Sequence, residues 1–65
     1  MKFSDKIRFL RFRLSLTQSE LAKELRVSFA TVNRWENDAA EPKRKHRIRL
    51  KQYCEQHGFY DLIDD

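Results

Sequence analysis

Residues 16–37 of this 65-residue chain read LTQSELAKELRVSFATVNRWEN, and they carry the clearest structural signals in the sequence. A capping box opens it: the Thr17 side chain can accept a backbone N–H, and Glu20, three residues on, can bond back to the Thr17 N–H. Leucine and alanine then recur at the spacing of one helical face. The stretch therefore predicts a short helix of about residues 17–25.

A second short helix is predicted almost immediately afterwards. Ser28 is a good N-cap residue, and Val32 and Trp35 lie three positions apart, so both side chains point the same way. These features predict a helix of about residues 29–36, separated from the first by the break at 26–28. Because apolar side chains are directed inward on both sides of the break, the second helix is expected to protrude from the body of the chain.

Two further helices are predicted to flank this pair. One covers about residues 5–13, with Ser4 as its N-cap. The other has Pro42 in its first turn and ends before Gly58. The apolar residues at 59–63 predict a short fifth helix that closes the core. With only one glycine and one proline, the chain is expected to be all-α, a compact bundle of four to five short helices in a single domain.

The charge of the chain is unevenly distributed. The formal net charge is +4, and all 14 basic residues lie within residues 1–54, which hold only six of the ten acidic residues. A basic body of this kind indicates a polyanionic partner, either a nucleic acid or an anionic membrane surface. Charge by itself does not decide between these partners and an ordinary solvated surface.

Catalytic and metal-binding motifs are not evident in the sequence. It contains no glycine-rich phosphate loop, no nucleophile elbow and no convincing carboxylate pair, so an enzyme is not expected. Cys54 and His57 share a helical face, but a closed metal site needs two more ligands and His46 is the only other histidine. The interpretation preferred here is a buried cysteine beside a partly buried histidine. No metal, cofactor or small-molecule ligand is predicted.

Localisation is inferred from three features. No apolar run approaches the 18 residues or so that would span a membrane. The first residues, MKFSD, lack the apolar stretch of a signal peptide. Cys54 is the only cysteine, which rules out an internal disulfide and fits a reducing compartment. We therefore expect a cytoplasmic, nucleoid-associated chain that does not enter membranes.

Taken together, these residues resemble the helix-turn-helix domains of the Cro/repressor type, whose fold is lambda-repressor-like. The resemblance lies in an ordered set of short motifs and covers about residues 4–57, with the helix-turn-helix motif itself at about 17–37. The matching segments are LTQSELAKEL at 16–25, VS at 27–28 and TVNRWEN at 31–37. The combination is specific, whereas an isolated leucine-alanine pair would not be.

Three positions depart from the family pattern. Arg26 stands in the turn between the two motif helices, where the family usually has glycine; Ser15 and Asp38 replace glycines that are common before and after the motif. A turn of this kind often requires a left-handed backbone, which costs a residue other than glycine roughly 1 kcal/mol or more. The apolar pattern on both sides of the turn is unaffected by these departures.

The resemblance, together with helix geometry, implies that the exposed face of the second motif helix reads DNA bases in the major groove. Phe29 and Ala30 are expected to contact thymine methyl groups. Asn33 and Arg34 are the polar readers, because asparagine pairs best with adenine and arginine with guanine. The alternatives are that Phe29 packs inward and that Asn33 and Arg34 only solvate the helix.

A second group of residues is implied to hold the DNA phosphates. Gln18, at the start of the first motif helix, matches a glutamine that clamps the DNA backbone, with free helix N–H groups assisting. Thr17 and Ser28 are assigned to the same group, although capping is the main role expected of both. The remaining members are Asn37, Lys43, Arg44 and Lys45.

Arg11 and Glu36 match positions that pair with each other in relatives. The pair is expected to join the first helix to the end of the second motif helix as part of the scaffold, with a phosphate contact by Arg11 as an alternative. Trp35 is expected to lie in the core, although its indole N–H also suits a groove contact.

The expected function is sequence-specific binding of double-stranded DNA by a transcriptional regulator. The main alternative is a protein-interaction or antitoxin-like adaptor module on the same fold, with Phe3, Phe9, Ile48 and Tyr60 as an exposed apolar surface. RNA is disfavoured because the A-form major groove is too narrow for a helix. A homodimer stays open, since no dimerisation segment is obvious.

Overall fold

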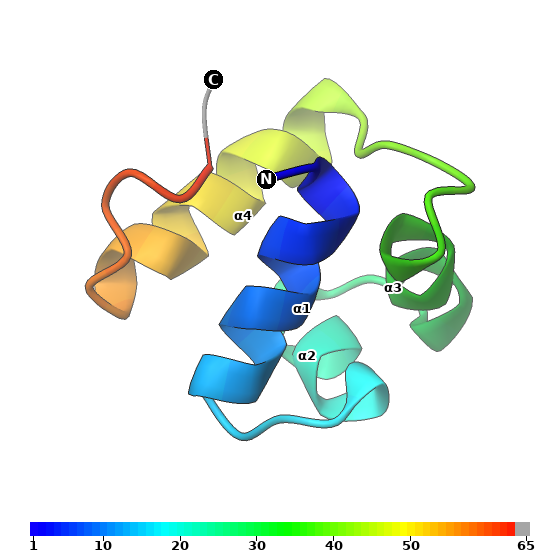
Figure 1. The fold of residues 1–65 in the computed structure, drawn as a ribbon, viewed down its shortest axis with the longest axis horizontal. Coiled ribbons are helices and arrows are strands. Elements are labelled where there is room, and N and C mark those ends of the chain that lie inside the picture. The colour runs from blue at the N-terminus through cyan, green and yellow to red at the C-terminus, as the bar shows by residue number, and fades with distance from the viewer. Residues whose placement is uncertain (64–65) are drawn as a thin grey trace.

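The computed structural model describes residues 1–63, and this part of the chain is an all-α bundle with four helices and no strand (Figure 1). The predicted fold class is thereby confirmed. The helices are α1 (Phe3–Arg13), α2 (Gln18–Leu25), α3 (Phe29–Glu36) and α4 (Arg44–Gln56). α3 packs against α1 and α2, and α4 packs against α2. An extended segment carries the chain from the end of α3 to the start of α4, as Figure 1 shows.

The two motif helices begin at the caps that the sequence predicts. The backbone N–H of Glu20 donates to the Thr17 hydroxyl at 3.1 Å, and the Thr17 N–H donates to the Glu20 carboxylate at 2.8 Å, which completes the capping box. The Ser28 hydroxyl accepts the Thr31 N–H at 3.1 Å. Each cap satisfies a backbone donor that the first turn of a helix leaves unpaired.

The outer helices begin at different residues from those predicted. α1 starts at Phe3, with Lys2 as its N-cap, and Ser4 lies buried inside the first turn. The cause is non-local, because the Phe3 ring packs edge-on against Trp35 at 5.8 Å and draws this turn onto the core. α4 starts at Arg44, because Pro42 is buried in the extended segment and packs there instead of opening the helix.

The predicted fifth helix is absent, because residues 59–63 form turns and bends. Gly58 adopts a φ of +86°, which ends α4 and reverses the chain. The Phe59 N–H then donates to the Cys54 carbonyl at 2.8 Å. Ile63 still reaches the core, where it is 4% exposed. A helix of five residues would form too few hydrogen bonds to offset the free-energy cost of helix nucleation. The segment therefore closes the core without becoming a helix.

The core is built from all four helices and Ile63. Its buried apolar members are Ile7, Leu10, Leu21, Ala22, Leu25, Val32, Trp35, Leu50, Tyr53, Cys54 and Ile63. Burial raises the pKa of the Cys54 thiol to about 11, so the group is held as a neutral, apolar-like side chain. His57 is exposed, contrary to the prediction that it would be partly buried, because it follows the last turn of α4 and rests against the Tyr53 ring at 4.4 Å.

Two polar contacts attach α4 to α2. The Tyr53 hydroxyl donates to the Glu24 carboxylate at 3.3 Å, and Arg49 donates to the Leu25 carbonyl at 3.0 Å. The second contact satisfies a carbonyl at the C-terminal end of α2, beside the turn that leads to α3. Burial and the neighbouring Glu24 charge raise the pKa of Tyr53 to about 12, so its proton remains available for this bond.

Within residues 1–63, no helix has both the length and the apolar character needed to cross a bilayer. The same residues include no group of three or more histidine, cysteine, aspartate or glutamate side chains that could hold a metal ion.

The three positions that lack a family glycine all adopt a left-handed backbone. The φ angles are +56° at Ser15, +59° at Arg26 and +61° at Asp38. Arg26 ends α2, and its N–H bonds to the carbonyls of Ala22 and Lys23. The turn geometry is therefore kept without glycine, at a steric cost of about 1–2 kcal/mol for an ordinary side chain in this region.

Replacing Arg26 with glycine is expected to raise the free energy of unfolding by about 1 kcal/mol, because glycine adopts a positive φ without a Cβ clash. Urea unfolding measures the change, provided that the dependence of the free energy of unfolding on urea concentration is the same in both chains. Arg26→Ala is the matched control: it keeps the Cβ and should stay within about 0.5 kcal/mol of the parent chain. A glycine variant less stable than the parent would show instead that the Arg26 side chain stabilises the turn.

Candidate nucleic-acid interface

α3 presents one face to the core and another to solvent. Val32 and Trp35 are buried, whereas Phe29, Ala30 and Arg34 are exposed. The Phe29 side chain is 52% exposed, so it does not pack inward. We call the surface formed by Phe29, Ala30, Asn33 and Arg34 the outer face of α3; Asn33 is its one partly buried member.

Arg34 is the most available polar group on the outer face. Its Nη2 lies 3.5 Å from the Thr31 hydroxyl, at the outer limit of a hydrogen bond. The guanidinium carries five N–H donors in a planar fork. Because this weak contact engages at most one of them, the fork remains able to meet a pair of acceptors.

A buried carboxylate stabilises the inner side of this arrangement. Glu36, at the end of α3, is 3% exposed. The Arg11 guanidinium of α1 donates two hydrogen bonds to its carboxylate, at 2.7 and 3.0 Å. Arg8 donates to the Glu36 main-chain carbonyl at 2.6 Å and lies 3.9 Å from the carboxylate. The fork geometry of the Arg11 contact is the strong, orientation-specific kind. It joins α1 to the C-terminal end of α3.

The ionisation of Glu36 depends on these contacts. Burial opposes ionisation, but hydrogen bonds from Arg11 and Gln18 and the positive charges of Arg11 and Arg8 outweigh it, so the pKa of Glu36 lies below its ordinary value. The carboxylate therefore remains charged at neutral pH.

Gln18 extends the network to the outer face of α3. Its amide nitrogen donates to Glu36 at 3.1 Å, and its amide oxygen accepts from Asn33 at 3.2 Å. Asn37 donates to the Asn33 side-chain oxygen at 3.1 Å and to the Asn33 carbonyl at 2.9 Å. The Asn33 amide is thus held between a neighbour on α2 and one at the end of α3. A primary amide has two donor hydrogens and two acceptor lone pairs, so half of its capacity remains free.

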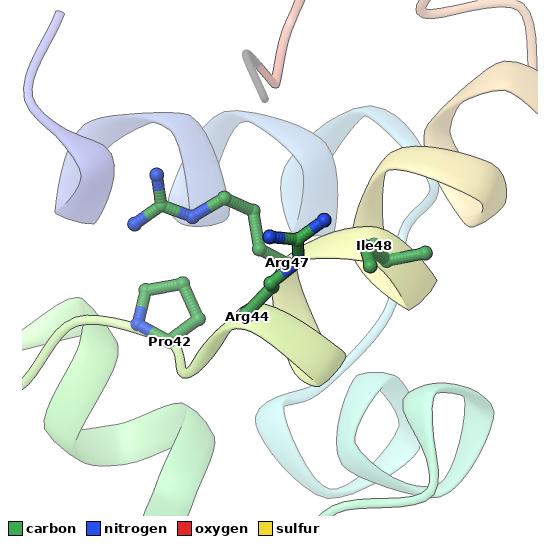
Figure 2. A pocket seen from close by; sticks show the side chains of 4 residues that line it. All are labelled: Pro42, Arg44, Arg47 and Ile48. Atoms are coloured by element: carbon green, nitrogen blue, oxygen red, sulfur yellow. The ribbon is translucent and has the colours of Figure 1, made fainter.

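The cations after the motif lie around the start of α4. Lys43, Arg44 and Lys45 are exposed. Figure 2 shows Arg44 and Arg47 beside Pro42 and Ile48, and these four residues line a hollow of about 550 Å³. Arg47 lies 3.9 Å from the Glu41 carboxylate.

A family model described as helix-turn-helix matches residues 7–46, which is more than half of the chain. The chain belongs to the Cro/repressor-type helix-turn-helix family. The HTH-type transcriptional regulator DicA of Escherichia coli (strain K12) is 35% identical over 65 residues, which is 100% of this chain and 48% of DicA. The chain thus spans about half the length of this curated relative. No solved structure matches it at a significant level.

In this helix-turn-helix domain, the residues assigned from sequence to the phosphates, together with Asn33, fall into three groups. Thr17 and Ser28 serve as helix caps, and each still has hydrogen-bonding capacity at its hydroxyl. Gln18, Asn33 and Asn37 form one connected amide chain that leads to Glu36. The exposed cations at the start of α4 stand apart from that chain.

Two residues of this helix-turn-helix domain were missed by sequence reasoning. Arg8 contacts Glu36 together with Arg11, and its spacing of three from Arg11 on the same helix is a signal that could have revealed it. Phe12 was given no role from the sequence, and the structure leaves it 66% exposed. Phe3 and Phe9 differ in the opposite sense: both are partly buried, against Trp35 and Phe59 respectively.

Proposed function

We propose that this chain binds double-stranded DNA sequence-specifically, with α3 in the major groove, as the DNA-reading part of a transcriptional regulator. The observation that carries the proposal is the outer face of α3, which projects into solvent with an available arginine and a pre-oriented amide. A major groove about 12 Å wide admits a helix presented in this way. The relationship to the regulator DicA supports the same function.

Within this proposal, four residues read bases. Phe29 and Ala30 meet thymine methyl groups, and Arg34 meets the two acceptors of guanine. Asn33 reads adenine with the donor and the acceptor that Gln18 and Asn37 leave free. Because these two neighbours fix the orientation of the amide, little rotational freedom is lost when it meets a base.

The phosphates are held from two sides. Thr17, Gln18 and Ser28 lie at the first turns of α2 and α3, where free backbone N–H groups also favour an anion. The DNA backbone at the C-terminal end of α3 is contacted by Asn37 and by the cations Lys43, Arg44 and Lys45. The two sets would fix the register of α3 in the groove.

Protein interaction remains the second candidate function. Ile48 is 45% exposed in the hollow at the start of α4, and Tyr60 is 68% exposed. These side chains suit a partner surface, including a second copy of the chain, which would place two outer faces on half-sites about one helical turn apart.

Selection of bound sequences from a pool of random duplexes tests the proposal. A recurring motif is expected, and its spacing would report the oligomeric state. Titration of the selected duplex at several salt concentrations should then give a log–log slope of about −4 to −5 for four to six phosphate contacts. A protein-interaction module would show no enrichment and no salt-dependent affinity.

Lys43→Ala is expected to weaken binding to selected and unrelated duplexes by similar factors, and to reduce the salt slope by about one. The physical reason is that this exposed cation would neutralise a phosphate and contact no base. Fluorescence anisotropy at three or more salt concentrations measures both effects. An unchanged slope would remove Lys43 from the phosphate contacts.

A further inference from the structure

Two exposed phenylalanines lie at one hollow beside the outer face of α3. Phe12, near the end of α1, is 66% exposed, and Phe29, at the start of α3, is 52% exposed. Both line a hollow of about 590 Å³ whose other walls include Thr17, Gln18 and Ser19, at the beginning of α2. Residues at the ends of α1, α2 and α3 therefore line one recess, and its lining combines two phenylalanine rings with polar side chains.

The Phe12 ring is held in place by the same network that supports α3. The Arg11 guanidinium lies 4.8 Å from the Phe12 ring centroid, and Arg11 is itself fixed by its bonds to Glu36. A cation above an aromatic face is an attractive contact. Phe12 thus presents its apolar surface to solvent while Arg11 holds its ring in place. Large aromatic side chains are usually buried, and those that are exposed often mark a binding surface.

We propose that this hollow receives a deoxyribose of the DNA backbone, with Phe12 packing on the sugar next to the phosphate held at Gln18. The inference rests on the proposed function. It adds a contact to the DNA that involves neither a base nor a phosphate charge. Three features favour this occupant. The hollow is continuous with the outer face of α3 through Phe29. Arg11, a cation that is paired with Glu36, is among the residues that line the hollow. A backbone sugar is apolar and adjoins an anion, which matches the two kinds of wall.

The sugar is preferred to a base as occupant. Bases of a duplex are stacked inside the helix, and exposing one costs energy, whereas the deoxyriboses lie on the outside next to the phosphates. A second copy of the chain could also bury Phe12, and the experiment distinguishes this case.

Phe12→Ser is expected to weaken binding about five- to tenfold, on selected and unrelated duplexes alike, because the apolar surface of one partly exposed ring is lost. The salt slope should stay unchanged, because no charge is removed. Phe12→Leu should keep most of the affinity. Hydroxyl-radical footprinting of the selected duplex should lose protection at one deoxyribose per bound chain. Gln52→Ser, at an exposed position of α4 that lines no part of the hollow, should leave affinity within about twofold.

The outcomes are distinguishable. If the parent chain binds no duplex, the proposed function fails. If the parent chain binds but Phe12→Ser has the same affinity and sugar protection, the hollow has no sugar contact and this inference alone is overturned. If Phe12→Ser instead turns a sedimenting dimer into a monomer without changing the protected sugar, the occupant is a second copy, and the inference is again overturned. Circular dichroism confirms that each variant is folded.

Discussion

Glu36→Ala is expected to lower the free energy of unfolding by about 3–5 kcal/mol, the usual cost of removing one partner from a buried ion pair. The substitution leaves the Arg11 guanidinium without its carboxylate, and removes the acceptor of Gln18 as well. In a chain of 65 residues, whose total stability is expected to be modest, this loss would leave much of the population unfolded at room temperature. Urea unfolding followed by circular dichroism measures it.

A matched control uses another glutamate. Glu41 is exposed and lies 3.9 Å from Arg47, so Glu41→Ala should change stability by less than about 1 kcal/mol. The double variant Arg11→Met, Glu36→Leu removes both charges together and should be more stable than Glu36→Ala. If Glu36→Ala were no worse than Glu41→Ala, the Arg11–Glu36 pair would not hold the bundle together.

Glu36 also makes stability depend on pH. Because its pKa in the folded chain lies below the ordinary value of 4.5, the paired carboxylate contributes its full stabilisation above that value. The contribution is lost as the pH falls through the folded pKa, where the proton displaces the ion pair. Thermal unfolding between pH 7 and pH 3 should therefore show a smaller acid destabilisation in Glu36→Gln than in the parent chain.

Arg34→Ala is expected to cost about 1–3 kcal/mol on the selected duplex and to relax the preference at one base pair. The reason is that Arg34 combines exposure with an almost unengaged fork of donors. The free energy of unfolding of the Arg34→Ala variant should change little, since the Arg34 side chain makes only one long contact. Binding to a panel of single-base variants of the selected duplex measures both the loss and its position.

Asn33→Ala is the informative comparison. Its loss should also concentrate at one base pair, but with some loss of stability, because Gln18 and Asn37 each lose a partner. If Arg34→Ala weakened every duplex equally, as Lys43→Ala is expected to do, Arg34 would be a phosphate contact and the assignment of base readers would be wrong.

Local signals in the sequence were sufficient to predict the motif helices. The capping box at Thr17 and the cap at Ser28 depend on neighbouring residues only, so α2 and α3 begin at the residues predicted. The start of α1 depends on Phe3 meeting Trp35, and the start of α4 on the burial of Pro42. Contacts between residues so far apart in sequence cannot be read from local patterns.

The side-chain network illustrates the same limit. The Arg11–Glu36 association came from the family resemblance, because no spacing rule connects residues so distant in the chain. The bonds from Gln18 to Asn33 and Glu36 depend on how α2 crosses α3, which only the packed structure defines. The exposure of Phe12 was equally hidden, because it depends on how α1 packs in the bundle.

The most direct test of the account is the change in backbone amide NMR shifts when the chain binds its selected duplex. The largest changes are expected in residues 17–18 and 28–37, with smaller ones at 43–45. Changes confined to 47–63, with the amides of Phe29 to Arg34 unmoved, would contradict the claim that α3 enters the DNA groove.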